Sequence, residues 1–198
     1  SNPNNAKVLE SNISLTELEA IDYALIVNSY LRLEQPMINH RIRKATLNGA
    51  SVSTINAKAF DFNYRISHSV LTSPQNTVAT LSGVLKALLD KNSQTLPDYL
   101  NSVSVHKTHI DIANALLNAK HPLVVLGEHV SGNTCSDQVA QLVVNIAKAS
   151  EAKTLNASLT GNAHSAERVN FKPDNGKNAL QILSSDLTAF ALFDVYPN

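Results

Sequence analysis

Hydrophobic residues in this chain form short unbroken runs that alternate with longer stretches of helical period. The runs "YALIV" at 23–27 and "HPLVVLG" at 121–127 are typical of parallel strands that are buried on both faces. Further strands are predicted from "ASVSTINA" at 50–57, "KTLNASLT" at 153–160 and "LTAFALFDVY" at 187–196. Because the strands alternate with helical segments, the pattern predicts an α/β fold with a doubly wound, mainly parallel sheet in Rossmann-like lobes.

The helix after the first strand carries start and stop signals. Pro36 suits the first turn of a helix, and Gly49 stands where a left-handed cap belongs. Between them, a buried stripe is predicted from Ile38, Ile42 and Ala45. We therefore expect one helix between the first two strands.

Four other helical segments are predicted from period or capping signals. Capping-box spacing occurs at Ser14 with Glu17 and at Thr108 with Asp111, the second pair at the front of a helix over 109–120. The apolar faces of the remaining two helices consist of Val78, Leu81, Leu85, Leu88 and Leu89, and of Val139, Leu142, Val143, Ile146 and Ala147.

Domain organisation is predicted from composition along the chain. Residues 1–12 are polar and without period, which indicates a disordered leader or a cloning remnant. Turn formers at 91–104 suggest a boundary between a first Rossmann-like lobe at 13–104 and a second at 105–198. The loop "NFKPDNGKN" precedes the predicted last strand, and no helix follows that strand. We therefore expect the second lobe to be truncated at its carboxyl end, as in a piece of a longer polypeptide.

Composition excludes several classes of function. Sixteen basic residues balance sixteen acidic ones, so no net field favours nucleic acid as a partner. The apolar runs are far shorter than the roughly 20 residues of a membrane-spanning helix, so direct membrane insertion is not expected. No secretory signal is evident. A single cysteine, Cys135, rules out both an internal disulfide framework and a self-contained iron–sulfur site.

The segment "GEHVSGNT" at 127–134 resembles a phosphate-binding P-loop in its spacing. Asn133, however, stands where that motif requires the lysine that faces the β and γ phosphates. Thr134 and Asp137 have capping-box spacing, which favours a plain turn from strand to helix. Cys135 has no nameable catalytic partner, and we expect it to be inert.

A second candidate is "HKTHID", in which His106, His109 and Asp111 could be imagined as metal ligands. His106 precedes the predicted cap and lies on non-helical backbone, so solvent-exposed histidines are the favoured interpretation. No G-x-S-x-G, H-E-x-x-H or G-x-G-x-x-G motif occurs in the chain. The sequence therefore assigns no catalytic, cofactor-binding or metal-ligating residue.

The third candidate is the turn "NSYLRLEQP", where a strand meets a helix start that could bind phosphate. The turn has no glycine for close backbone approach, and Tyr30 and Leu31 add bulk. Glu34 adds a negative charge that repels an anion. Arg41, Arg43 and Lys44 fall in the last turns of the same helix, where cations complement its dipole, and a solvated helix end is favoured over an interface. We therefore expect an empty site.

The stretch from 20 to 58 resembles the large iron–sulfur subunit of bacterial NADH:quinone oxidoreductase, respiratory complex I, in its molybdopterin-oxidoreductase-like region. That family has the pattern "AD-x-[IVL]-L-[IVL]-V-G-x-N-P-R" followed by "E-x-P-[IVL]-[IVL]-N-x-R-[IL]-R-K-A". Weaker similarity continues at 116–130 and 189–198. The residues that match the pattern are Asp22, Arg32, Glu34, Pro36, Asn39, Arg41, Arg43, Lys44 and Ala45.

This resemblance implies lobes of the formate dehydrogenase and dimethyl sulfoxide reductase type. It also implies a non-catalytic structural segment of an enzyme that passes electrons from NADH towards quinone. Asn28, Ser29, Tyr30 and Leu31 replace the glycine and Asn-Pro that cradle the pterin nucleotide, which implies a degenerate site with no cofactor. Iron–sulfur clusters are expected in an amino-terminal part that lies outside this chain.

The resemblance further implies partners and a location. The partners are the rest of the same subunit and other subunits of the peripheral arm, at the cytoplasmic face of a bacterial inner membrane. Two alternatives stay open: a domain of a catalytic molybdopterin oxidoreductase of the formate dehydrogenase kind, and a binding module. The second rests on "AKHPLVVLGEHV", which also resembles the nucleotide-binding domain of thiamine-diphosphate enzymes.

Overall fold

A computed structural model describes residues 10–128, 136–158, 169, 181–182, 184–186 and 188–189. Ser1–Gly161 form one compact unit, and Asn162–Asn198 form a second. The predicted loop at 170–178 lies outside the described residues, as does all but Thr188 and Ala189 of the strand predicted at 187–196. The described strands, and the helices that connect them, belong to the first unit.

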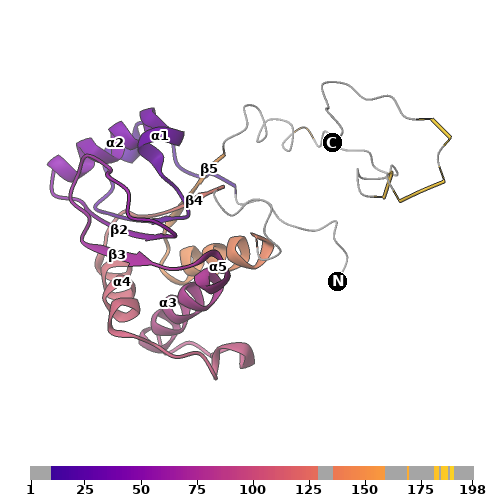
Figure 1. The fold of residues 1–198 in the computed structure, drawn as a ribbon. Coiled ribbons are helices and arrows are strands. Elements are labelled where there is room, and N and C mark those ends of the chain that lie inside the picture. The colour runs from indigo at the N-terminus through magenta and orange to yellow at the C-terminus, as the bar shows by residue number, and fades with distance from the viewer. Residues whose placement is uncertain are drawn as a thin grey trace. The chain divides into compact units, whose positions relative to one another are not determined.

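The described strands of this unit form one five-stranded, all-parallel sheet with the order β3-β2-β1-β4-β5 (Figure 1). Their bounds are Tyr23–Val27 for β1, Ser51–Asn56 for β2, His68–Leu71 for β3, Pro122–Gly127 for β4 and Lys153–Ala157 for β5. The parallel α/β sheet confirms the predicted fold class. Of these strands, only β3 was not predicted from the sequence.

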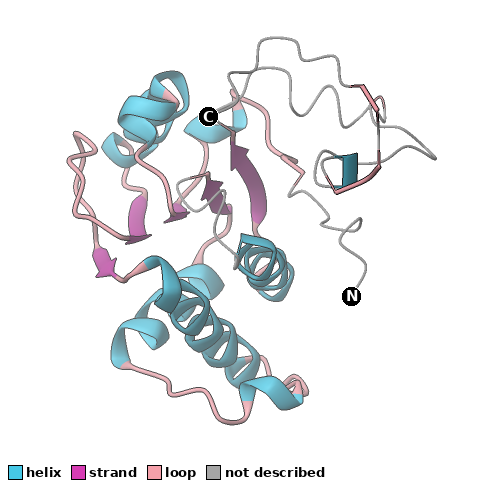
Figure 2. Ribbon diagram, turned by 45° about the vertical axis from the view of Figure 1, so that its right-hand side comes forward, coloured by secondary structure: helices cyan, strands magenta, loops and turns pink. Residues whose placement is uncertain are grey.

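Helices cover both faces of the sheet (Figures 1 and 2). Alternate residues of β1 belong to different cores: Ala24 and Ile26 to the one that includes α2, and Leu25 and Val27 to the one that includes α3, α4 and α5. This alternation is the doubly wound arrangement that the sequence predicts. The helices are α1 Leu31–Glu34, α2 Pro36–Leu47, α3 Thr77–Lys91, α4 Lys107–Asn118 and α5 Ser136–Ala149, with short 3-10 turns η2 Glu17–Glu19, η3 Pro74–Asn76 and η4 Asp98–Leu100.

The helix signals in the sequence are confirmed at most positions. Pro36 is the first residue of α2, and Gly49, just beyond its end, has a φ of +101°. The five residues predicted for the apolar face of α5 are its buried residues. One start signal was wrong: α4 begins after His106 rather than at a Thr108 cap, so Asp111 lies inside the helix. The turn "NSYLRLEQP" also contains the short helix α1, which was not predicted.

Residues 91–104 connect two halves of one sheet rather than two separate sheets. The strand that follows this segment, β4, pairs directly with β1, so that Leu25 lies opposite Val124. Both strands also belong to the compact unit Ser1–Gly161. The turn formers that suggested a lobe boundary therefore mark a crossover between helices on one face of the sheet.

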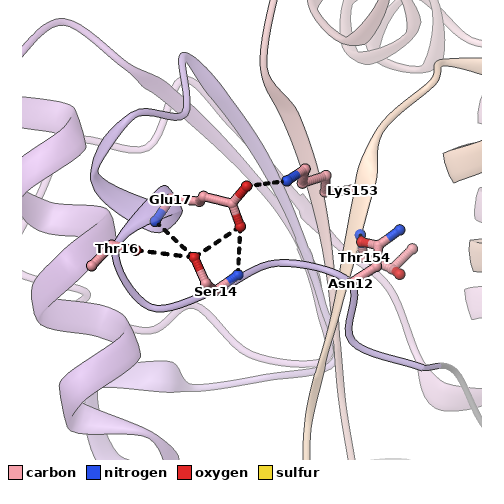
Figure 3. A network of polar contacts seen from close by, with 6 residues as sticks. All are labelled: Asn12, Ser14, Thr16, Glu17, Lys153 and Thr154. Atoms are coloured by element: carbon pink, nitrogen blue, oxygen red, sulfur yellow. Dashed lines mark hydrogen bonds and ion pairs between the residues drawn. The ribbon is translucent and has the colours of Figure 1, made fainter.

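The outer edge of β5 is bound by the chain segment at residues 10–12. The Asn12 N–H donates to the Thr154 carbonyl oxygen at 3.0 Å, and the Thr154 N–H donates to Asn12 Oδ1 at 2.7 Å (Figure 3). The Asn156 N–H donates to Ser11 Oγ at 3.0 Å. These residues were assigned to a disordered leader, and that assignment is wrong for 10–12 because they satisfy backbone groups of an edge strand.

The predicted capping box at Ser14 and Glu17 comes directly after this segment and is confirmed. The Ser14 N–H donates to Glu17 Oε2 at 2.8 Å, and the Glu17 N–H donates to Ser14 Oγ at 3.3 Å. Glu17 also forms an ion pair with Lys153 at the start of β5 (Figure 3). Hydrogen bonds from Lys153 and Ser14 lower the pKa of Glu17 to about 2. The beginning of the described chain is thus anchored to the last strand of the sheet.

Candidate functional site at the carboxyl rim

The strand order places a topological switch point between β1 and β4, whose chain connections leave in opposite directions along the sheet. In open α/β sheets, ligands bind in the crevice outside the carboxyl ends of such strands. Here that rim consists of Asn28 and Ser29 after β1, Gly127 at the end of β4 and Asn56 at the end of β2. It is the place to look for a ligand site.

Hydrogen-bond donors at the end of β1 are engaged by Glu34. The Tyr30 N–H donates to Glu34 Oε1 at 3.0 Å, and the Ser29 hydroxyl donates to Glu34 Oε2 at 2.7 Å. The carboxylate thus receives both bonds from the turn that would otherwise present donors to an anion. The sequence predicted that Glu34 would sit at the start of α2, but its carboxylate bonds back to the residues just before α1.

The backbone of Ser29 is held by a second side chain from the neighbouring strand. The Ser29 N–H donates to Asn56 Oδ1 at 2.9 Å, and Asn56 Nδ2 donates to the Ser29 carbonyl at 3.2 Å. Asn56 is 2% exposed, so both bonds are made away from water. A further hydrogen bond at the same rim links the start of α2 to the end of β5: Gln35 Nε2 donates to the Ser158 carbonyl just beyond β5 at 2.6 Å.

The end of β4 also lies so close to the backbone just after β1 that no free space remains between them. A Cβ at Gly127 would lie 2.3 Å from the Asn28 carbonyl oxygen and 2.4 Å from the Ser29 Cβ. Gly127 is therefore required by the contact between the two strand ends. Asn28 itself adopts a left-handed φ of 51°, a conformation that asparagine tolerates better than most residues.

Aromatic side chains pack beside the same rim. Tyr30 stacks on Phe60 with ring centroids 4.6 Å apart, and it meets the buried Phe62 edge to face at 5.7 Å. The segment that carries these phenylalanines is fixed to α2 by Asn39, whose Nδ2 donates to the Phe62 carbonyl and whose Oδ1 accepts from the Tyr64 hydroxyl. This cluster was not predicted from the sequence, although the alternating aromatics of "FDFNY" at 60–64 were a visible signal.

A family model for molybdopterin oxidoreductases matches residues 2–190 of this chain. The chain belongs to the molybdopterin oxidoreductase family. Among curated proteins, this family member is 27% identical over 147 residues to the NADH-ubiquinone oxidoreductase 75 kDa subunit of Reclinomonas americana. The match covers 74% of this chain and 17% of that subunit, so the chain spans a small part of its relative's length.

Among solved structures, the family member is similar to a chain of the formyltransferase/hydrolase complex from Methylorubrum extorquens, which was solved with methylofuran. The TM-score is 0.48 at 11% sequence identity, and the match covers 74% of this chain and 39% of that chain.

The family name implies a pterin nucleotide, and the described part of the rim does not fit one. The Ser29 and Tyr30 N–H groups already donate to Asn56 and Glu34. The Glu34 carboxylate would also repel a pyrophosphate. One polar group here is unpaired, the buried Nδ2 of Asn28, a neutral amide nitrogen with two N–H donors. This group alone cannot replace the charge-assisted bonds that anion binding requires.

Two residues of the basic cluster on α2 have partners. Arg41 and Lys44 both form ion pairs with Glu19 of η2, while Arg43 is exposed. The hydrogen bond from Arg41, followed by that from Lys44, lowers the pKa of Glu19. Arg32 on α1 pairs with Asp61 in the aromatic segment, at 2.5 Å. The matched residues Arg32, Arg41 and Lys44 thus join helices to neighbouring segments of the same unit.

Asp22, another matched residue, lies at the opposite edge of the sheet. Its carboxylate accepts from the N–H groups of Lys120 and His121, at 2.7 and 2.9 Å, and so holds the turn before β4 against the start of β1. Burial acts to raise the pKa of Asp22, but these two donors, together with the Asp22 backbone N–H and the charge of His121, outweigh it and the pKa lies below its usual value. The role of Asp22 is structural.

The other two candidates do not form sites among the described residues. His106, His109 and Asp111 are not a metal-holding group, and no group of three such ligands is present in the part of the chain that the structure describes. His106 is exposed as expected, but His109 is 5% exposed, so the expectation of an exposed side chain was wrong for it. Of the P-loop-like segment, Gly127 and Glu128 are described, while Asn133, Thr134 and Cys135 lie outside the described residues.

Proposed function

We propose that this chain is a non-catalytic structural segment of the large iron–sulfur subunit of NADH:quinone oxidoreductase, which passes electrons from NADH towards quinone. The segment is a degenerate molybdopterin-type domain that carries no cofactor of its own. Iron–sulfur clusters belong to an amino-terminal part of the subunit outside this chain. The distant likeness to a 75 kDa subunit supports the assignment, as do the matched residues from Asp22 to Ala45.

The observation that carries the absence of a cofactor is the bond between Glu34 and the turn after β1. A carboxylate that accepts from the Tyr30 N–H and the Ser29 hydroxyl takes the position and the charge that a ligand phosphate needs. Asn56 and Gly127 close the remaining backbone at the same rim. A sheet edge bound in this way serves packing rather than ligand exchange.

Partners and location follow from the proposed subunit. The domain packs against the rest of its own subunit and against neighbours in the peripheral arm, at the cytoplasmic face of a bacterial inner membrane. Within the described residues, no helix is both long enough and apolar enough to cross a membrane.

Calorimetric titration of the protein with guanosine diphosphate tests the empty rim. We expect no heat of binding at nucleotide concentrations up to about 1 mM, where even a weak site of about −4 kcal/mol would be half filled. Stoichiometric binding in the micromolar range would contradict the proposal. Such binding would favour the alternative, a domain of a catalytic molybdopterin oxidoreductase, for which the unpaired Asn28 Nδ2 is the one supporting observation.

The structural role is tested in the full-length subunit within its assembled complex. Replacing Leu25, which is fully buried in β1, by Asp should reduce the amount of assembled complex because it places a charge in the core. Glu34→Gln should leave NADH oxidation per assembled complex unchanged. A loss of activity per complex in Glu34→Gln, with normal assembly, would show that the rim takes part in the reaction.

A further inference from the structure

His109 occupies a position that is unusual for a histidine, in the first turn of α4 and 5% exposed. Its Nδ1 accepts a hydrogen bond from the backbone N–H of His106, the N-cap residue, at 3.2 Å. The imidazole therefore takes the place that a Glu or Gln side chain usually has at the third position of a capping box. An Nδ1 that accepts has no proton, so the neutral ring carries its proton on Nε2.

The same imidazole fills the space above a glycine on the neighbouring helix. A Cβ at Gly83 of α3 would lie 2.2 Å from His109 Nδ1 and 2.5 Å from Cε1. The ring is thus held between its own N-cap and the backbone of α3. His109 thus packs against α3 on one side and accepts a hydrogen bond from the N-cap of its own helix on the other.

The surroundings disfavour a second proton on this ring. Burial lowers the pKa of His109, and the neighbouring His106, whose ring centroid is 5.2 Å away, lowers it further. Among the other groups, Lys86 donates to the carbonyls of Asn101 and Val103. The titratable residues on α4 and on the elements packed against it are His106, Lys107, Asp111, Lys86, Asp90, Lys91, Tyr23 and His68.

We propose that the His106–His109 pair is a pH-sensitive latch, in which neutral His109 caps α4 against α3 and its protonation releases the first turn of α4. Protonation places a hydrogen on Nδ1, directly opposite the His106 N–H, so the capping bond is lost. It also creates a buried cation next to a second imidazole. Both effects act on the same turn, Lys107–Ile110, and on the segment before it.

The sign follows from the lowered pKa of His109. The pKa of His109 is lower in the folded protein than its unfolded value of 6.5. Neutral His109 therefore stabilises the folded state fully at pH values above 6.5, and this stabilisation is lost as the pH falls from 6.5 towards the pKa in the folded state. Local opening of the first turn should therefore rise by up to about tenfold per pH unit across that window, the slope of one proton.

Hydrogen–deuterium exchange of the whole protein at about pH 7.5 and about pH 5.5, corrected for intrinsic exchange rates, tests the latch. We expect protection to fall in peptides that cover 103–112 and to stay constant in peptides of β1 and α5. His109→Asn should abolish this pH dependence, because its Oδ1 can accept from the His106 N–H but does not titrate.

The matched control is His40→Asn, which replaces an exposed histidine on α2 and should leave the pH dependence of 103–112 as it is in the wild type. His106→Ser should also keep a pH dependence, since the N–H at position 106 is a backbone group, but a weaker one, because the imidazole that helps to lower the pKa of His109 is removed. Unchanged protection of 103–112 between the two pH values would overturn the proposal. Wild-type pH dependence in His109→Asn would do the same.

Discussion

At the level of single residues, Gly127 shows how tightly the ends of β1 and β4 approach each other. We expect Gly127→Ala to lower the free energy of unfolding by about 1–3 kcal/mol, the usual cost of overpacking. The nearest atom to the new Cβ would be the Asn28 backbone oxygen, which cannot rotate away as a side chain could. Urea denaturation followed by circular dichroism measures the change. An unchanged midpoint would mean that the two strand ends can separate at little cost.

The lowered pKa of Asp22 leads to a prediction of how the free energy of unfolding depends on pH. Because the pKa of its carboxyl is below the ordinary value of 3.8, the charged form stabilises the fold above that value and the contribution is lost as pH falls through the folded pKa. Asp22→Asn should cost about 1–2 kcal/mol at neutral pH. The stability of the Asp22→Asn variant should also fall less than that of the wild type between about pH 5 and pH 3.

Urea titrations at a series of pH values measure this difference. Asp98→Asn, at an exposed carboxylate, is the matched control and should follow the wild-type profile. If Asp22→Asn showed the same loss of stability in acid as the wild type, the bonds from Lys120 and His121 would not be the source of the effect.

Individual residues were predictable where the signal is local. Ser14 with Glu17 and Pro36 were predicted because caps and helix starts depend on residues a few positions apart. Asn56 was not, since its partner Ser29 lies 27 residues away and comes close only when the strands pair. His109 was missed for another reason: histidine is not a usual capping residue, so the spacing pattern pointed to Thr108 and Asp111 instead.

At the level of elements, Gly49 at the end of α2 allows the cost of backbone conformation to be measured without a steric clash. Gly49 has a φ of +101°, but a Cβ there would meet nothing within 4 Å. Gly49→Ala should therefore cost about 1 kcal/mol from conformation alone. Gly49→Asn should cost less, because asparagine tolerates positive φ. Thermal denaturation of the two variants compares their losses of stability. Equal losses would show that the positive φ is not the reason why glycine is favoured at this position.

Elements were predicted well where hydrophobic period was strong and poorly where it was weak. The apolar face of α5 was identified residue by residue, because five side chains at helical spacing face one core. β3 was missed because "HSVL" has four residues that alternate between half-buried and exposed, as an edge strand allows. The pairing of 10–12 with β5 carries no period, since it depends on Asn and Ser side chains.

At the scale of the whole molecule, the parallel sheet could be predicted because right-handed crossovers leave few arrangements for alternating strands and helices. Its switch point could not, since the sequence suggested a lobe boundary between β1 and β4, and only the folded chain pairs these two strands. The missing glycines predict that no phosphate cradle is present, and this stays a prediction. The way in which the rim is closed could not be predicted. Glu34 acts within one turn, but Asn56, Gly127 and Phe60 reach the rim from other elements, and only the folded chain brings them together.

The edges of the sheet give a prediction for the molecule as a whole. Removing residues 1–12 would break four hydrogen bonds between the segment 10–12 and β5 and would leave β5 as an open edge. At about 0.5–1.5 kcal/mol for each net bond, the free energy of unfolding should fall by roughly 2–6 kcal/mol. An unpaired strand edge also templates association with other chains, so the shortened protein should self-associate as its concentration rises.

Removing residues 1–9 alone provides the matched control, because it leaves Glu10, Ser11 and Asn12 in place. Urea denaturation reports the loss of stability, and sedimentation velocity at several concentrations reports association. The prediction requires that both effects appear on going from the shorter to the longer deletion. If the two deletions unfolded at the same urea concentration and both sedimented as monomers, the side-chain bonds of Ser11 and Asn12 would contribute nothing net. The edge of β5 would then have to be protected by its own length and twist, which is how short edge strands avoid pairing when no segment covers them.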